Sequence, residues 1–305
     1  VTYLLYPFML DGAALISPDA DVSGAIKPYF TIDMPPIMSV TSALIFAFVL
    51  GFGLAVTKTE RIMDVVDDLR IIINKIISSV IIPLLPLYIL TIFMSITYVG
   101  EISKVLVVFI KIIILIFVLT VILLLIYFSI AGIVAKKNPL TLLKRMMPAY
   151  ITALGTSSSA ATIPVTYEST LSNGVKTSIA SFVIPLCATI NMPGSMLKIV
   201  ACSLAVIYTT GMEISFSQYS AFIFTLAVTM VAAPGVPGGA IMTALAPLSA
   251  VLGFSQETNA LMIALYIVMD SFGTAANVTG DGAIAVILDK IYKHDHHITE
   301  DETEA

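Results

Sequence analysis

The sequence predicts an all-α membrane protein whose transmembrane helices are accompanied by two re-entrant helical hairpins in a pseudo-inverted repeat. Apolar residues make up 58% of the chain and charged residues only 11%, a balance far from that of a soluble globular domain. The run 105–134, broken only by Lys111, exceeds the roughly 20 apolar residues that a helix needs to cross a bilayer. Two other apolar segments have centres rich in Ser, Gly and Pro, which interrupt a helix.

Apolar patterns predict helices, in chain order, at about 37–57, 71–98, 101–135, 175–210 and 258–292. The two hairpins are expected at about 141–166 and 215–254, with tips at 155–164 and 234–239. Backbone without helical hydrogen bonds is tolerated at membrane depth only where it is buried in protein or lines a watery cavity, because lipid offers no hydrogen-bond partners. Both tips should therefore face a polar site.

Each hairpin is followed by a span that contains its own interruption, at 191–195 in the first repeat and at 273–280 in the second. A repeated hairpin and broken helix is typical of a secondary transporter whose binding site lies between the two repeats. Most of the 15 Lys and Arg residues fall in loops on one side, which the positive-inside rule assigns to the cytoplasm. This count places the C-terminus in the cytoplasm, opens the first hairpin from the cytoplasm and opens the second from outside.

Composition excludes several other classes of protein. A net charge of −5 without a block of Lys or Arg argues against a nucleic-acid partner. The two cysteines, Cys187 and Cys202, lie in one apolar stretch and provide neither a disulfide framework nor a four-ligand zinc site. No His or Lys accompanies the serine-rich tip as a general base, so we do not expect an enzyme.

Polar chemistry is concentrated in the last predicted helix. At about 100° per residue, Asp270, Thr274, Asn277 and Asp281 share one face. Carboxylates inside a span are costly unless they hold a cation, an ammonium group or a proton. Near Gly280, an unwound turn would add carbonyls to Asp281 and form an all-oxygen site for Na⁺, whereas Asp270 is expected to pair with a substrate ammonium. The serine tip offers backbone N–H groups and helix N-termini to a carboxylate.

Four motifs in this order resemble the dicarboxylate/amino acid:cation symporter family, which includes archaeal aspartate transporters and the excitatory amino acid transporters. They are Ser-Ser-Ser-Ala-Ala-Thr-Ile-Pro at 157–164, Asn-Met-Pro-Gly-Ser at 191–195, Gly-Val-Pro-Gly-Gly at 235–239 and Asn-Val-Thr-Gly-Asp at 277–281. The resemblance covers most of the chain. It implies the glutamate-transporter-homologue fold, a homotrimer in the plasma membrane when full length, and an elevator motion of a transport domain against a trimeric scaffold.

The resemblance also implies a substrate pocket. Ser158, Ser159 and Asn277 would hold the α-carboxylate of an amino acid. Asp270 would hold its ammonium group together with carbonyls from both tips. The full set of implied pocket residues is Ser157, Ser158, Ser159, Ser195, Val236, Asp270, Gly273, Thr274 and Asn277.

Two Na⁺ sites are implied by the same resemblance. One is formed by the carbonyls of Cys187, Asn191 and Asn277 with the Asp281 carboxylate, and the other lies around Thr189, Met192 and the second tip. Pro193 stands where the family motif has an Asp that helps to bind a third cation, so a third Na⁺ is not expected. Coupling to fewer Na⁺ ions, or to a proton on a buried carboxylate, would each supply a driving force.

The expected substrate is a small neutral amino acid. Gly273 stands where acidic-substrate members carry an Arg, no basic residue is expected to replace it, and Ser157 is uncharged. A second substrate carboxylate would therefore enter without a partner. Asp270 in turn argues against simple dicarboxylates. The alternatives are a symporter of acidic amino acids or C4-dicarboxylates, with protons as a possible coupling ion, and, more remotely, an anion-conducting channel.

The expected domain organisation is a partial scaffold at 1–98, a transport domain at 99–293 and a cytoplasmic tail at 294–305. The resembling family has three helices before the region that 1–57 matches. The N-terminal helices of the scaffold are therefore expected to be missing from this chain.

Overall fold

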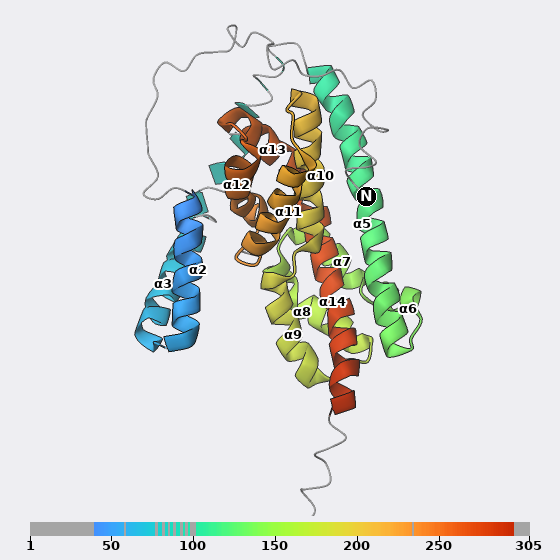
Figure 1. The fold of residues 1–305 in the computed structure, drawn as a ribbon. Coiled ribbons are helices and arrows are strands. Elements are labelled where there is room, and N and C mark those ends of the chain that lie inside the picture. The colour runs from blue at the N-terminus through green and yellow to red at the C-terminus, as the bar shows by residue number, and fades with distance from the viewer. Residues whose placement is uncertain are drawn as a thin grey trace, which may run out of the picture. The chain divides into compact units, whose positions relative to one another are not determined.

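The computed structural model describes residues 40–57, 59–76, 102–233 and 235–295, together with single residues between 79 and 97 (Figure 1). Within these residues every regular element is helical, which confirms the all-α prediction. The helices are α2 (Val40–Thr57), α3 (Glu60–Ile76), α5 (Ile102–Ala135), α6 (Pro139–Arg145), α7 (Met147–Thr156), α8 (Ser159–Ser172), α9 (Thr177–Ile190), α10 (Pro193–Thr210), α11 (Phe216–Met230), α12 (Gly239–Leu252), α13 (Gln256–Val268) and α14 (Asp270–Asp295).

Length and composition identify candidate membrane spans among the described residues. Phe109–Ala135 and Thr177–Thr210 are each long and apolar enough to cross a bilayer. The bent pair formed by Thr258–Val268 and Asp270–Tyr292 adds a third if it is one span. These helices fit a multi-pass membrane protein.

The chain divides into two compact units. Unit 1 comprises the described residues within Val1–Ile110, Cys202–Thr229 and Ile241–Leu265. Unit 2 comprises those within Lys111–Ala201, Met230–Ala240 and Tyr266–Ala305. All four sequence motifs lie in unit 2, so the candidate site can be described within that unit alone.

Unit 2 is organised around α14, which packs against α7, α8 and α9 (Figure 1). Helix α7 packs on α8, and α8 packs on α9. Many contact positions carry small side chains that are fully buried, such as Ala149, Ala153, Ala180 and Ala275. Small residues let helix backbones approach closely, which is how helices associate in a membrane.

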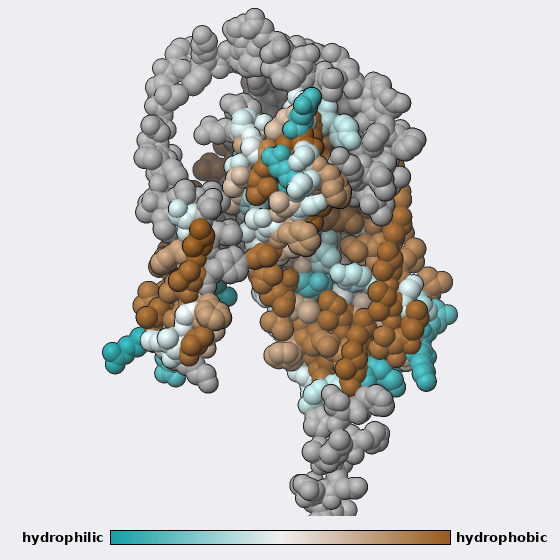
Figure 2. All heavy atoms as spheres, viewed as in Figure 1, coloured by the Kyte–Doolittle hydropathy of each residue, from teal (hydrophilic) through white to brown (hydrophobic). Residues whose placement is uncertain are grey.

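The outer face of unit 2 is apolar. Large hydrophobic side chains such as Ile114, Phe117 and Phe182 are exposed on α5 and α9. Figure 2 shows hydrophobic residues gathered over the lower part of this unit, with hydrophilic residues near α6. An apolar exterior around a partly polar interior is the pattern expected of helices that face lipid.

Several basic and polar side chains fix helix ends in unit 2. Asn138 caps α6 by accepting hydrogen bonds from the N–H groups of Leu140 and Thr141, and Pro139 occupies the first helical position. Two cations, Lys137 and Arg145, donate to the carbonyls of Asn173 and Ser172 at 2.6 and 2.9 Å, at the end of α8. Residues that count only as loop charge in the sequence therefore also terminate a helix.

The predicted interruption of the last helix at 273–280 is wrong. Helix α14 runs without a break from Asp270 to Asp295. The break in this span lies at Met269, between the end of α13 and the start of α14. The glycines are explained by packing instead. A Cβ atom on Gly282 would lie 2.5 Å from the Met146 side chain, and one on Gly280 would lie 3.1 Å from the ring of Tyr127.

A helix also occupies a segment that the sequence argument treats as a loop. Helix α3 covers 60–76, although the predicted helix begins only at residue 71. Its charged residues recur at helical spacing, with Arg70 and Asp67 paired at 3.2 Å, one turn apart. The density of charge in this segment hides an amphipathic period from a search for apolar runs.

Candidate functional site

The first hairpin reverses direction at two serines. Helix α7 ends at Thr156, and Ser157 adopts a left-handed conformation with φ of 49°. Ser158 then caps α8, because its hydroxyl oxygen accepts a hydrogen bond from the Ala161 N–H at 3.2 Å. The serine tip is therefore a helix end, a turn and a helix start within four residues.

The tips of the two hairpins are in contact. The Ser158 hydroxyl donates to the Gly235 carbonyl at 2.9 Å, and the Ala160 N–H donates to the same oxygen at 3.3 Å. Gly235 also lies close to the end of α9, where an added Cβ atom would stand 2.8 Å from the Ala188 carbonyl oxygen. Only a glycine permits the second tip to sit this close.

Helix α14 holds the start of α10 through one amide. The span is broken at Asn191 and Met192, between α9 and α10. Asn277 Oδ1 accepts from the N–H groups of Gly194 and Ser195 at 2.8 and 3.3 Å, and its Nδ2 donates to the Ser195 hydroxyl at 2.9 Å. Asn277 thus satisfies backbone donors that the helix start leaves open.

These elements enclose a small pocket. Its lining residues are Ser157, Ser159, Met192, Ser195, Gly235, Val236, Ala240, Tyr266, Asp270, Thr274 and Asn277. The structure thus brings together all the predicted substrate residues except Ser158 and Gly273, which lie just outside this lining. Gly235, Ala240 and Tyr266 were not predicted. The free volume is about 10 Å³, roughly that of one water molecule, so a larger molecule enters only when a tip moves.

Asp270 is the only charged side chain among the described residues that line the pocket. It is the first residue of α14 and is mostly buried. One carboxylate oxygen, Oδ2, accepts from the Gly238 N–H of the second tip at 2.8 Å. The other, Oδ1, lies 3.4 Å from the ammonium nitrogen of Lys198. Asp270 therefore connects the second hairpin to α10.

The expectation that no basic residue stands near position 273 is wrong. Lys198 reaches this place from α10 with 0% of its surface exposed. A Cβ atom on Gly273 would collide with the Lys198 side chain, whose Nζ would be 2.5 Å away. The sequence does contain a signal for this residue, because a lysine inside an apolar span requires a partner and Asp270 is available.

The residues assigned to the first Na⁺ site lie together in part. Asp281 is buried, and its Oδ1 accepts from the Asn191 side-chain amide at 2.7 Å. The Cys187 carbonyl is at the same helix end and accepts from the Asn191 N–H at 2.8 Å. Asn277 is one turn before Asp281 on α14. A carboxylate beside the carbonyls of a helix end suits a hard cation such as Na⁺.

The second assigned Na⁺ site is less compact. Met192 lines the substrate pocket, whereas Thr189 is exposed, and its hydroxyl donates to the Leu186 carbonyl of its own helix at 2.8 Å. Within the described part of the chain, no group of three or more His, Cys, Asp and Glu residues is placed to hold a metal ion. Near the first site the donors are carbonyl and amide oxygens with the Asp281 carboxylate, and near the second the carboxylate is that of Asp270.

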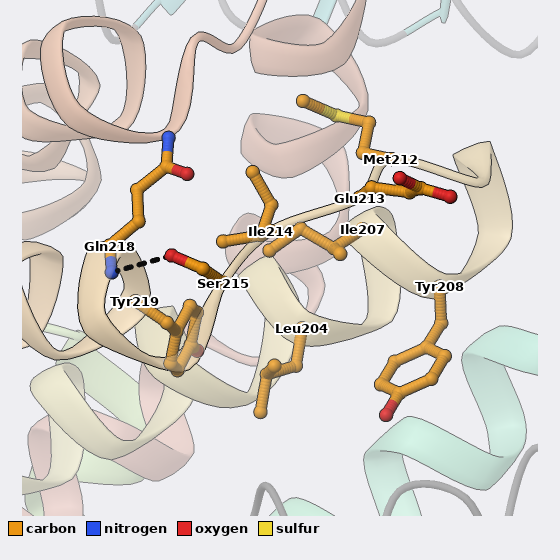
Figure 3. A pocket seen from close by; sticks show the side chains of 9 residues that line it. All are labelled: Leu204, Ile207, Tyr208, Met212, Glu213, Ile214, Ser215, Gln218 and Tyr219. Atoms are coloured by element: carbon orange, nitrogen blue, oxygen red, sulfur yellow. Dashed lines mark hydrogen bonds between the residues drawn. The ribbon is translucent and has the colours of Figure 1, made fainter.

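A larger cavity of about 590 Å³ lies in unit 1, between the end of α10 and the start of α11 (Figure 3). Its walls mix apolar and polar side chains, Glu213 is the one charged residue among the described residues that line it, and the Gln218 N–H donates to the Ser215 hydroxyl at 3.2 Å. None of the four motifs contributes to it. We therefore place the candidate site at the small pocket of unit 2.

Comparison with known proteins gives a consistent picture. The sequence pattern of the sodium:dicarboxylate symporter family matches residues 2–291. Excitatory amino acid transporter 1 of Homo sapiens is 33% identical over 172 residues, which are 56% of this chain and 31% of that protein. Excitatory amino acid transporter 3 of Mus musculus is 36% identical over 170 residues, covering 55% and 32%. The matched region spans about a third of the length of these relatives.

Proposed function

Because this chain belongs to the sodium:dicarboxylate symporter family, we propose that it is the transport-active part of a symporter that carries a small neutral amino acid together with Na⁺. The observation that carries the proposal is the charge of the pocket. Its one charged lining residue, Asp270, is balanced by the buried Lys198. A neutral amino acid is a zwitterion without net charge, so it adds no uncompensated charge to this site.

In the proposed complex the substrate lies between the two tips. Its carboxylate is held by Ser159 at the N-terminus of α8, where the helix dipole favours an anion. Its ammonium group binds Asp270, which has acceptor capacity beyond its bonds to Gly238 and Lys198. A carbonyl from each tip, those of Ser157 and Val236, completes the ammonium site.

Sodium is the proposed coupling ion, bound by Asp281 with the carbonyls of Cys187, Asn191 and Asn277. Support comes from the family description and from the position of Asp281 at the break between α9 and α10. A Na⁺ ion at Asp281 would order this break and the Asn277 side chain, which borders the substrate pocket. Substrate and Na⁺ would then strengthen each other's binding, as coupled transport requires.

Transport is proposed to proceed by an elevator motion in a homotrimer in the cell membrane, with the C-terminus in the cytoplasm. The second hairpin is the proposed outer gate. The hydrogen bonds that hold it closed run from the Ser158 hydroxyl and the Ala160 N–H to the Gly235 carbonyl, and from the Gly238 N–H to Asp270. A gate held by few hydrogen bonds opens at a modest cost in free energy. Such opening is required because the closed pocket is too small to admit a substrate.

A second candidate is a symporter of acidic amino acids or dicarboxylates. Two observations favour it: the name of the family, which specifies dicarboxylates, and the ammonium group of Lys198 beside Gly273. In this alternative a substrate carboxylate would draw Lys198 away from Asp270.

The two candidates are separated by uptake into liposomes that contain the full-length protein. Serine, alanine, aspartate and a C4-dicarboxylate are offered under sodium and proton gradients imposed separately. We expect uphill accumulation of serine or alanine driven by an inward Na⁺ gradient. Preferential accumulation of aspartate or the dicarboxylate would overturn the neutral substrate, and an ohmic, substrate-independent current would identify a channel.

A further inference from the structure

The Lys198 side chain is enclosed by the residues around the break between α13 and α14. Its ammonium group donates to the carbonyls of Met269 and Asp270 at 3.0 and 3.1 Å and lies 3.9 Å from the centre of the Tyr266 ring. Carbonyls at a helix end, an aromatic face and a carboxylate all favour a cation. These groups form a cation-binding environment, and the cation that occupies it is the ammonium group of Lys198 itself.

Gly273 is the residue that makes room for this cation. The volume that a side chain on α14 would occupy at this position is filled by the Cε and Nζ atoms of Lys198. The positive charge thus comes from α10 and stands behind Asp270, since Lys198 does not line the pocket. In this structure its nearest carboxylate is that of Asp270, 3.4 Å away.

We propose that Lys198 is a specificity-determining residue: its ammonium group cancels the charge of Asp270, so that the pocket selects substrates by their net charge and prefers a net charge of zero. This inference rests on the proposed function. Under this proposal the preference for a neutral substrate comes from the Lys198–Asp270 pair, and not from the absence of a charged side chain at position 273.

Lys198 acts on the substrate through Asp270. The net charge of the preferred substrate should therefore change when either residue loses its charge. Without Lys198 the pocket carries an uncompensated carboxylate and should prefer a substrate with a net positive charge. Without the carboxylate of Asp270 it carries an uncompensated ammonium group and should prefer a net negative one. Without both charges the preference should return to a neutral substrate.

The test uses three ligands of similar size that differ in charge: asparagine, aspartate and 2,4-diaminobutyrate. Their affinities for the full-length protein in detergent are measured from ligand-induced shifts of the unfolding temperature. The variants are Lys198→Met, Asp270→Asn and the double variant. The double variant is the matched control, because buried ion pairs are often replaced together at little cost to stability.

In the wild type we expect asparagine to bind more tightly than either charged ligand. Lys198→Met should raise the affinity for diaminobutyrate relative to asparagine by at least about tenfold, Asp270→Asn should do the same for aspartate, and the double variant should restore the wild-type order. If one single variant fails to fold, the other still tests the proposal. A folded single variant that ranks the three ligands by affinity as the wild type does would overturn the proposal. It would also be overturned if the wild type bound aspartate most tightly and Lys198→Met lost that preference.

These measurements report binding and not transport. Failure of the proposed function would appear separately, as an absence of Na⁺-driven uptake by the wild type in liposomes. Failure of the present inference would appear as an unchanged order of charge preference in the variants.

Discussion

The two carboxylates on the polar face of α14 differ in the charge of their partners. Asp270 has the Lys198 ammonium group 3.4 Å from one oxygen and a backbone N–H on the other. Asp281 is equally buried but has a neutral partner, the Asn191 amide at 2.7 Å. A buried carboxylate without a cation is costly. Asp270 thus has a cation from the protein, and this difference supports the proposal that Asp281 is the residue that binds the coupling ion.

The largest expected effect is at Asp281. Replacing it by Asn keeps the shape and removes the charge, so Na⁺-dependent substrate binding should weaken by about 100-fold or more, as expected when one partner of a buried ion pair is removed. The concentration of Na⁺ that gives half-maximal uptake measures this. Asp289→Asn, on the same helix, is the control and should leave sodium dependence unchanged. An unchanged requirement in Asp281→Asn would remove this residue from the ion site.

A second effect tests the shared space of Lys198 and Gly273. Arginine at position 273 alone should destabilise the fold by about 1–3 kcal/mol or more through overpacking, because it collides with Lys198. The double variant Lys198→Ala, Gly273→Arg should recover stability and keep the preference for a neutral substrate, because it places one positive charge near Asp270 again. Thermal unfolding and an uptake panel measure the two properties. A single variant as stable as the wild type would show that the collision is relieved in another way.

Gly235 tests the close approach of the second tip. An alanine here would place its Cβ atom 2.8 Å from the Ala188 carbonyl oxygen and should push the tip away from α9. We expect the affinity for substrate to fall by about tenfold, which corresponds to a loss of about 1.4 kcal/mol of binding free energy. The free energy of unfolding should change little. Binding of labelled substrate is the measurement. Affinity equal to the wild type would mean that the tip adapts without opening.

An effect of similar size is expected at Ser158. Alanine removes the cap of α8 and the hydroxyl bond to Gly235, a combined loss of about 1–2 kcal/mol. The second tip should then open more often, which raises the labelling rate of a cysteine introduced at Val236. Ser172→Ala, at the other end of α8, is the control. Equal labelling rates in both variants would argue against a role for the Ser158 hydroxyl in closure.

The sequence predicts the helical class and the positions of the tips, because Ser, Pro and Gly act locally on the backbone. It misplaces the break in the last span. Gly273 and Gly280 look like helix breakers in one dimension, and only the neighbouring Lys198 and Tyr127 side chains show that they serve close packing. Local composition cannot separate these two uses of glycine.

The candidate site is predicted to a similar extent. Spacing on one helix brings Asp270, Thr274 and Asn277 to one face, and the structure places all three at the pocket. The contribution of Lys198 is missed because it is a contact between helices more than 70 residues apart in sequence. Gly273 has no side chain and therefore no charge of its own. In the structure the positive charge at this place comes from Lys198 of α10.

The most direct test of the central claim is a parallel measurement of radioactive sodium and labelled serine uptake into liposomes that contain the full-length protein. We predict that serine accumulates with two Na⁺ ions, that Asp281→Asn reduces sodium entry per serine, and that aspartate accumulates less than serine. Serine uptake without sodium entry, or aspartate taken up in preference to serine, would contradict it.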